Sequence, residues 1–126
     1  MNTPSPFIHP IDALSLWNRV TIRCMRELPH DLTTRQLAII FSIYLTPPPH
    51  TVRSLSAHLG ISKPAICRAL DSLSTLDFIK RKKDEKDKRN VFIQRTIIGS
   101  VFLRDVADII SQEMNKNNSS SIAEVA

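Results

Sequence analysis

The chain has 126 residues, with 42% hydrophobic and 23% charged side chains and a formal net charge of +5. This length suits one domain, and the composition is typical of a globular protein rather than a disordered one. No apolar run approaches the ~20 residues needed to cross a bilayer. The first residues also lack the pattern of a secretory signal, so we expect a cytoplasmic protein that does not act at a membrane.

Residues that often hold metals or carry out catalysis are few in this chain. Its two cysteines, Cys24 and Cys67, are too far apart in sequence for a disulfide framework or a zinc-knuckle pattern. The four histidines show no paired spacing of the kind that zinc sites use. The sequence also has no phosphate-binding loop, nucleophile elbow or dinucleotide-binding glycine pattern. We therefore expect no metal ion, no other cofactor and no enzymatic activity.

The first residues and the first predicted helix differ in composition. Residues 1–10 are rich in proline and should form an irregular N-terminal arm. Between residues 11 and 28, apolar side chains recur every three or four positions. This spacing predicts a helix that ends before Pro29.

A second helix is predicted from a capping signal. Thr33 and Gln36 have the spacing of a capping box ahead of an apolar run, so the helix should extend to about Leu45. Three prolines follow at 47–49. They favour a rigid connector over a polyproline segment that docks a partner.

The middle of the chain has the pattern of a helix-turn-helix. Two helices are predicted, at 51–59 and 63–76, and Gly60 lies at the tight turn between them. Ser62 is a suitable N-cap for the second helix, and Pro64 fits its first turn. A capped N-terminus of this kind is well suited to contact with phosphate.

A basic hairpin and a last helix complete the predicted elements. Residues 77–82 and 91–95 are typical of two strands, joined by a polar tip at 83–90. Thr96 is a suitable cap for a helix that extends to about Met114. The chain is thus expected to have three segments: an irregular arm at 1–10, a domain at 11–114 with its helix-turn-helix at about 51–76 and its wing at about 77–95, and a disordered tail at 115–126.

Positive charge is concentrated in the helix-turn-helix and the hairpin. Residues 51–95 contain eleven basic and five acidic side chains, a net charge of +6. Such an uneven distribution indicates a protein that binds a polyanion, and with the adjacent helix pair it indicates DNA. The alternative is a solvated lysine-rich loop that serves solubility.

Over roughly residues 11–114, the chain resembles the MarR family of bacterial transcription regulators. The segment DEKDKR at 84–89 is similar to the family's D-x-R-D-x-R wing pattern, and TIIG at 96–99 is similar to its L-T-x-x-G. The segment LSAHLGIS at 55–62 is similar to its L-A-x-x-L-G-V-S. Asp77 stands where the family has glycine, which predicts an altered or slightly strained turn before the wing.

The resemblance implies a dimer whose helix at 63–76 enters the major groove of double-stranded DNA. It also implies that the hairpin follows the DNA backbone or enters the minor groove. On the helix and its cap, the residues expected to contact DNA are Ser62, Lys63, Pro64, Ala65, Cys67 and Arg68. On the wing they are Lys82, Lys83, Lys86, Lys88 and Arg89.

Individual roles can be assigned to some of these residues. Arg68 could read a guanine edge or contact phosphate alone, and Ala65 could contact a thymine methyl group. Arg89 is expected to enter the minor groove. Asp87 either orients Arg89 through a charge-assisted hydrogen bond or is simply solvated.

The first and last helices carry more apolar surface than a small domain needs to cover itself. A symmetric partner would bury the same patch twice, which predicts a homodimer; packing within one chain is the alternative. The expected fold class is mainly α, within the α+β proteins. It consists of a winged helix-turn-helix domain with N- and C-terminal dimerisation helices.

We therefore expect a sequence-specific DNA-binding transcription regulator, and specifically a dimeric repressor that recognises an imperfect palindrome in the bacterial nucleoid. The alternatives are a nucleoid or replication protein without sequence preference, and a winged-helix module that binds an acidic protein. Trp17, Phe41 and Tyr44 could line a pocket for an unknown small-molecule effector, but they are more typical of a core. Cys24 is a possible redox residue because two arginines flank it, although a buried inert cysteine is the simpler interpretation.

Overall fold

The computed structural model describes the backbone of residues 8–125 and the side chains as far as Lys116. The chain divides into two compact units. The first, which we call the helical pair, combines residues up to Asp31 with those from Arg104 onward. The second, the winged unit, contains Leu32–Leu103. The single domain expected over 11–114 is therefore divided, because both ends of the chain form a unit of their own.

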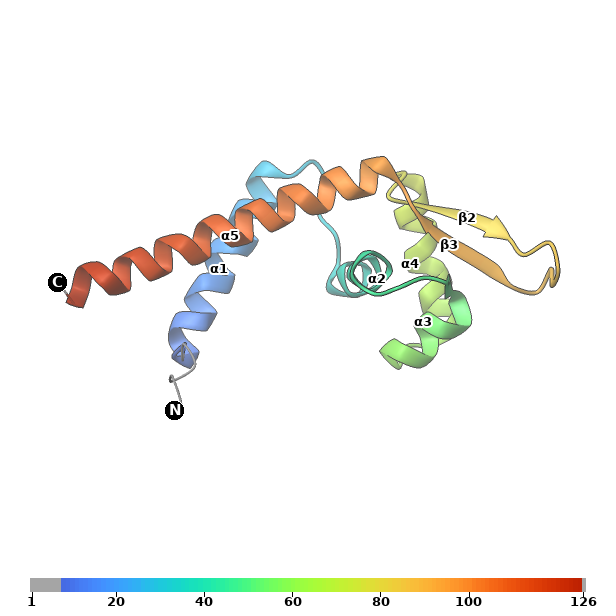
Figure 1. Cartoon of the computed structure of the whole chain (residues 1–126), viewed down its shortest axis with the longest axis horizontal. Coiled ribbons are helices and arrows are strands. Elements are labelled where there is room, and N and C mark those ends of the chain that lie inside the picture. Colours follow the sequence, from blue (N-terminus) through green and yellow to red (C-terminus); the bar gives the residue numbers. More distant parts are fainter. Residues whose placement is uncertain (1–7, 126) are drawn as a thin grey trace. The chain divides into compact units, whose positions relative to one another are not determined.

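Apart from the short strand β1, the elements follow one another in the predicted order (Figure 1). They are α1 (Pro10–Glu27), α2 (Thr34–Leu45), β1 (His50–Thr51), α3 (Val52–Leu59), α4 (Lys63–Thr75), β2 (Ile79–Lys83), β3 (Val91–Arg95) and α5 (Ile97–Val125). The capping box predicted at Thr33 and Gln36 is confirmed, since each side chain accepts a hydrogen bond from the other residue's backbone N–H. A second capping box, between Thr51 and Ser54, begins α3.

The first strand of the hairpin and the last helix have other boundaries than predicted. The hairpin's first strand begins at Ile79 rather than at residue 77. The last helix continues to Val125, so the backbone of 115–125 is helical where a disordered tail was expected, because no proline or glycine interrupts it there. Most of the predicted N-terminal arm, and the last residue of the predicted tail, lie outside the described residues.

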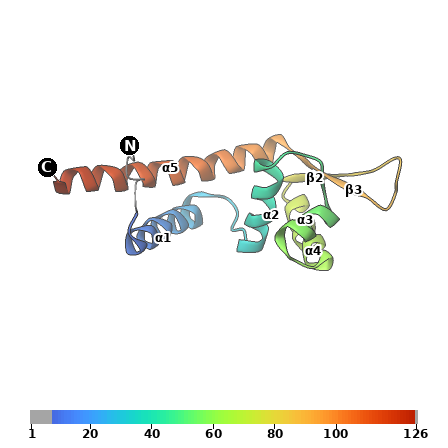
Figure 2. The ribbon, with the colours of Figure 1, turned by 60° about the horizontal axis from the view of Figure 1, so that its bottom comes forward.

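The winged unit packs three helices against a small antiparallel sheet of order β1-β3-β2. The two-residue strand β1 was not predicted; it pairs His50 with Ile93 and Thr51 with Phe92. The largest fully buried side chains all belong to this unit and come from α2, α3 and α4: Ile39, Ile40, Ile43, Leu55, Ile66, Leu70 and Leu73. In both views the hairpin of β2 and β3 extends away from α3 and α4 (Figures 1 and 2). The helices thus supply the core, and the hairpin forms the wing.

The turn between α4 and β2 is strained, which is one of the two outcomes that the sequence predicts. Asp77 has a φ of 60°, in the left-handed region that favours glycine. Two backbone hydrogen bonds end the helix here: Asp77 N–H donates to the Ser74 carbonyl, and Phe78 N–H donates to the Leu73 carbonyl. The Thr96 hydroxyl donates to the Asp77 carbonyl at 2.6 Å. Position 77 is therefore fixed in its strained conformation from both sides.

The Tyr44 hydroxyl joins α2 to both ends of the wing. It donates to the Phe78 carbonyl at 2.7 Å and accepts from the Thr96 N–H at 2.9 Å. Gly99 lies so close to Tyr44 that a Cβ at this position would overlap the hydroxyl and the Phe78 carbonyl. The Thr96 hydroxyl also accepts from the Gly99 N–H, which confirms its predicted role as the cap of α5. We call this arrangement of Tyr44, Phe78, Thr96 and Gly99 the wing anchor.

Arg95 holds the end of β3 against α2. Its Nε donates to the Ile43 carbonyl at 2.8 Å, and Nη2 donates to the Thr46 carbonyl at 2.9 Å. These are carbonyls of the last turn of α2 and its C-cap, which the helix itself leaves without partners. A cation at a helix C-terminus is also favoured by the helix dipole. One side chain thus caps α2 and fixes the base of the wing.

The helical pair is joined by a buried carboxylate. The Glu113 side chain is only 3% exposed, and it receives Arg19 at 3.2 Å and Arg23 at 3.0 Å from α1. Lys116 lies 3.2 Å from the same carboxylate. The hydrogen bond from Arg23 holds the pKa of Glu113 below its usual value, although burial opposes this shift.

Within residues 8–125, no helix is both long and apolar enough to cross a bilayer.

Replacing Asp77 by glycine should stabilise the protein. A left-handed conformation costs an L residue about 1–2 kcal/mol, and glycine relieves this strain. The larger entropy of glycine in the unfolded chain offsets part of the gain in stability. We therefore expect the Asp77→Gly variant to raise the free energy of unfolding by about 1 kcal/mol, measured by urea denaturation. Gly60→Ala is the matched control, because φ is 65° there and no atom lies within 4 Å of the added Cβ. It should be destabilised by about the same amount, and a loss of stability in both variants would contradict this account of the turn.

The Glu113 carboxylate should stabilise the fold at neutral pH and lose that effect in acid. Because its pKa is lowered in the folded state, the unfolded chain binds the proton more readily. The stabilisation is therefore complete above the unfolded pKa of about 4.3 and disappears as the pH falls through the lower folded value. Thermal unfolding of wild type and Glu113→Gln between pH 3 and pH 7 tests this. The variant should be less stable at pH 7, and the difference should shrink at the acid end; a difference independent of pH would contradict it.

Candidate nucleic-acid interface

Helix α4 has one buried face and one polar face. The buried side chains are Ala65, Ile66, Ala69, Leu70 and Leu73. The exposed side chains include Lys63, Pro64, Cys67, Arg68 and Asp71. The Ser62 hydroxyl accepts from the Ala65 N–H at 3.3 Å, which confirms the predicted N-cap. The helix therefore presents a capped N-terminus and a cationic outer face.

Ala65 does not belong to the exposed face. Ala65 is only 6% exposed, whereas the sequence placed it on the exposed side of the helix with a possible contact to a thymine methyl group. The physical reason is its position one turn before Ala69, which is equally buried. The small methyl group lets α4 pack closely and leaves none of its surface for DNA. The other five predicted residues of this segment remain exposed.

Two carboxylates order the turn at the tip of the wing. Asp84 accepts from the Lys86 N–H at 2.9 Å, and Asp87 accepts from the Arg89 N–H at 3.1 Å. Aspartate side chains commonly stabilise turns by such bonds to the backbone two residues on. Asp87 also accepts from Nε of Arg89 at 3.2 Å, while the Arg89 side chain stays 92% exposed. This geometry permits the orienting role predicted for Asp87.

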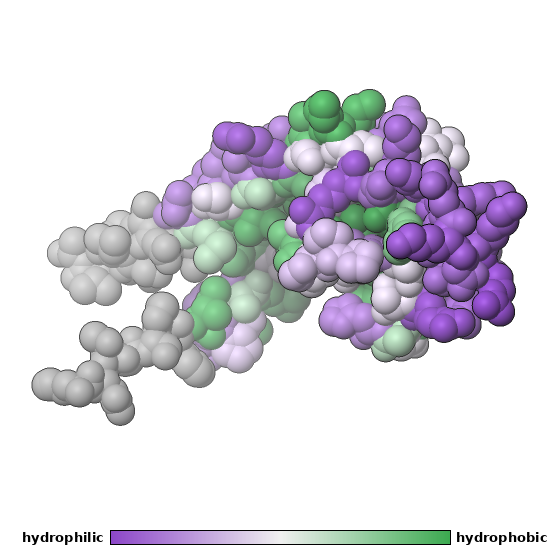
Figure 3. All heavy atoms as spheres, turned by 45° about the vertical axis from the view of Figure 1, so that its right-hand side comes forward, coloured by the Kyte–Doolittle hydropathy of each residue, from purple (hydrophilic) through white to green (hydrophobic). Residues whose placement is uncertain are grey.

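The cations of β2 alternate between the two faces of the hairpin. Lys82 and Lys83, both predicted to contact DNA, are neighbours in a strand and so point to opposite faces. Both are exposed, as are Lys86 and Lys88 near the tip. Figure 3 shows hydrophilic surface over the end of the molecule where the wing lies. The wing thus carries positive charge on both of its faces.

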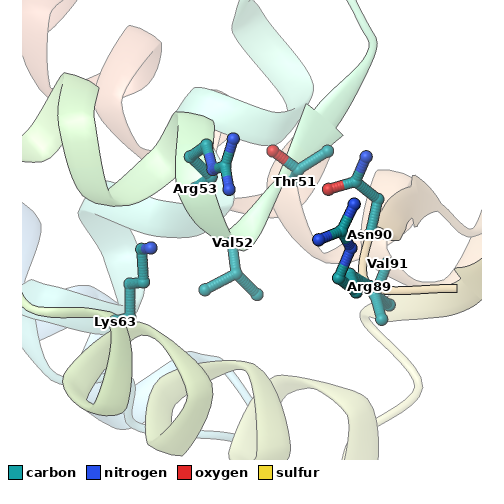
Figure 4. A pocket seen from close by; sticks show the side chains of 7 residues that line it. All are labelled: Thr51, Val52, Arg53, Lys63, Arg89, Asn90 and Val91. Atoms are coloured by element: carbon teal, nitrogen blue, oxygen red, sulfur yellow. The ribbon is translucent and has the colours of Figure 1, made fainter. Parts of the chain in front are cut away.

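A shallow pocket brings together cations from three elements (Figure 4). Arg53 comes from the first turn of α3, Lys63 from the first turn of α4, and Arg89 from the residues before β3. Figure 4 shows Arg53 and Lys63 on one side of Val52 and Arg89 on the other. The pocket measures about 150 Å³. Three cations beside two helix N-termini form a surface suited to a phosphate group.

The pocket contains a residue that sequence reasoning missed. Arg53 was counted in the basic segment but was not predicted to contact DNA. Thr51 and Ser54 form the capping box that places Arg53 in the first turn of α3. This capping signal was readable in the sequence. That α3 begins beside Lys63 and Arg89 depends on the packing of the winged unit.

The two cysteines lie in different environments. Cys24, on α1, is partly buried, and Cys67, on α4, is exposed. Burial raises the pKa of the Cys24 thiol, and Glu27 raises it further, whereas Arg23 lowers it. Arg23 is paired with Glu27 at 2.6 Å, so its charge does little for the thiol. These observations oppose a redox role for Cys24, because the thiolate is the reactive form.

Other candidate features are weaker. Among residues 8–116, no group of three or more histidine, cysteine or acidic side chains could hold a metal ion. Trp17 is 53% exposed and is therefore not part of a core. Tyr44 belongs to the wing anchor.

Comparison with known proteins identifies the family. The model of the MarR family matches residues 30–90. Three similar solved structures are MarR (23% identity, TM-score 0.64, covering 85% of this chain and 80% of that one), overoxidized AbfR bound to DNA (20%, 0.64, 91% and 82%) and an S. aureus MepR–DNA complex (16%, 0.67, 92% and 96%). At these identities the structures show the same fold. Residues 30–90 match the MarR family, and the solved structures show its winged-helix fold for this chain.

The family determines the general class of function. MarR-family proteins are DNA-binding transcription regulators and not enzymes, and this chain is one of that class. The expectation that it has no enzymatic activity is confirmed on this ground. In helix-turn-helix proteins the second helix, here α4, is the one that lies in the major groove.

Proposed function

We propose that this protein is a sequence-specific transcription regulator that acts as a dimeric repressor, competing with polymerase for a promoter. The observation that supports this most is the continuity of the cationic surface. The exposed face of α4, the wing and the pocket of Arg53, Lys63 and Arg89 all belong to one compact unit. MepR and AbfR have each been solved bound to DNA, which favours the same use of this fold. We place the protein in the bacterial cytoplasm, at the nucleoid.

In this proposal α4 enters the major groove. Arg68 reads a base edge, since a bidentate guanidinium contact discriminates guanine. Ser62 and Lys63 at the helix N-terminus contact phosphate, where the helix dipole and free N–H groups favour an anion. Pro64 and Cys67 lie against the groove wall. These contacts combine one specific interaction with several that only position the helix.

The wing contacts the flanking DNA. Lys82, Lys83, Lys86 and Lys88 neutralise backbone phosphates. Arg89, held by Asp87, enters the minor groove, where its weakly hydrated guanidinium is favoured when the groove is narrow. Arg53 and Lys63 hold a phosphate beside the start of β3, within the pocket they share with Arg89. The wing thus supplies most of the salt-dependent affinity.

A homodimer is supported by the exposed apolar face of α1. Ile11, Leu14 and Trp17 recur every three residues and are 68%, 66% and 53% exposed. On α5, Ile98 and Met114 are also exposed. Apolar side chains in such number on one helix favour burial against a second copy, and a twofold axis buries each patch twice. Two α4 helices related by this axis would recognise an imperfect palindrome.

Two substitutions separate base reading from phosphate contact. Arg68→Ala should cost about 1–3 kcal/mol on a selected site and much less on random DNA, because it removes a base contact. Lys88→Ala is the matched control. It should weaken both DNAs alike and lower the salt slope by about one for each phosphate that is no longer neutralised, or two per dimer. Fluorescence anisotropy over a salt series measures both effects, and equal losses of affinity on selected and random DNA for Arg68→Ala would contradict sequence-specific reading.

The dimer is tested separately from DNA binding. Sedimentation equilibrium should find a dimer of the wild-type chain at micromolar concentration. Leu14→Glu, in the middle of the exposed α1 face, should shift it to monomer, since a buried unpaired charge is costly. Arg26→Glu, an exposed charge change on the same helix, is the control and should leave the dimer intact. A wild-type monomer at this concentration would contradict the proposal.

The main alternative is a nucleoid protein that binds DNA without sequence preference, because the same cations would neutralise the phosphates of any DNA. Selection of DNA sequences with the purified protein distinguishes the two. A specific regulator should prefer selected over random DNA by roughly 10³ or more. An interaction module for acidic proteins should show no such preference.

A further inference from the structure

One cation of the wing is turned toward α4 rather than toward solvent. Arg81, in the middle of β2, places Nη2 2.7 Å from Oδ1 of Asp71. The same Nη2 lies 3.3 Å from the Cys67 carbonyl oxygen. Asp71 and Cys67 are one helical turn apart on α4. Arg81 therefore bridges the first strand of the wing to one side of the groove-facing helix.

The pleat of β2 explains why Arg81 differs from its neighbours. It lies on the same face of the strand as Ile79, which is 2% exposed, and pairs across the sheet with Ile93, which is 3% exposed. This face packs toward the helices. Lys80 and Lys82 point to the opposite face. Of these three cations, Arg81 is the one directed at α4.

The ion pair also changes the charge of the α4 surface. The Asp71 side chain is 67% exposed, on the polar side of the helix. A free carboxylate at that position would repel the phosphates of a bound duplex. Arg81, whose side chain is 35% exposed, lies against it and offsets this charge. The ion pair thus joins the wing to α4 and offsets the negative charge of Asp71.

We propose that Arg81 is a positioning residue for DNA recognition: it fixes α4 against the wing and neutralises Asp71, and it does not itself contact a phosphate. The inference rests on the proposed function for its role in DNA recognition. The mechanical link is independent of DNA. The basic segment then contains two kinds of cation: those that contact the nucleic acid, and Arg81, which orients the surface that they form.

The test compares Arg81→Ala with Lys82→Ala, its neighbour on the other face of β2, in the full chain. An exposed ion pair contributes up to ~1 kcal/mol, so Arg81→Ala should weaken binding to a selected site by about fivefold. Random DNA should be affected less, and the salt slope should not change. Lys82→Ala should weaken both DNAs alike and lower the salt slope by about one per phosphate. A lowered slope in Arg81→Ala would overturn the proposal, because it would make Arg81 a phosphate ligand.

Asp71→Asn supplies the second arm of the experiment. Added to Arg81→Ala, it should restore part of the affinity, because the uncompensated carboxylate is gone. Arg81→Lys keeps a cation near Asp71 and should also recover part of the affinity. If the double variant binds no better than Arg81→Ala, the electrostatic part of the proposal is wrong. A gain in affinity and in salt slope for Asp71→Asn alone would likewise overturn it, since the freed arginine would then be binding phosphate.

Hydrogen exchange of the protein without DNA separates this inference from the proposed function. Arg81→Ala should speed amide exchange in the second half of α4, and Lys82→Ala should leave it at the wild-type rate. Unchanged exchange in Arg81→Ala would overturn the mechanical link. If wild type shows no preference for any selected sequence, the proposed function fails, while the exchange result still decides whether Arg81 braces α4.

Discussion

The proposed DNA-binding surface depends on one hydroxyl group. Tyr44, near the end of α2, bonds to the carbonyl that precedes β2 and to the N–H that follows β3. Gly99 allows this approach, because any side chain there would overlap the hydroxyl. Without the hydroxyl, the two ends of the hairpin would no longer be tied to one point on α2, and the wing could change its angle to α4. A long basic wing can contribute to recognition only if its base is fixed.

The charges of the wing can be fully exposed because other groups maintain its shape. Asp84 and Asp87 hold the tip through bonds to the backbone, and Arg95 holds the base by capping α2. These residues contribute structure. In the proposed function, the exposed lysines then contact phosphate without disturbing the fold and give binding its salt dependence. Arg81 and Asp71 extend the same division of roles to the junction between wing and helix.

The helix caps and the turn that depend on a residue and its near neighbours could be predicted from the sequence. The capping box at Thr33, the N-cap at Ser62 and the strained turn at Asp77 each follow from a residue and its near neighbours, and the structure confirms all three. Strand β1 was missed, because two residues carry no periodic signal and their pairing depends on where β3 lies. Ala65 was placed on the wrong face, since alanine is common on both faces and the position lies at the edge of the apolar stripe.

Contacts between elements could not be predicted in the same way. The pocket of Arg53, Lys63 and Arg89 requires three chain segments to meet. The pairing of Arg81 with Asp71 requires the pleat of β2 and its packing against α4. The sequence shows that these residues are charged but not which of them face one another. Division into two units was also missed, because α1 and the later part of α5 are far apart in sequence and are joined through Glu113.

The central claim is that α4 and the wing act as one rigid surface fixed by Tyr44, and the most direct test is the DNA preference of Tyr44→Phe. This variant keeps the ring but removes the hydroxyl that bonds to the Phe78 carbonyl and the Thr96 N–H. The preference for selected over random DNA should fall, because the wing no longer keeps a fixed angle to α4, and the free energy of unfolding should fall by about 1–3 kcal/mol, the cost of removing one partner of a buried hydrogen bond. An unchanged preference would contradict the account.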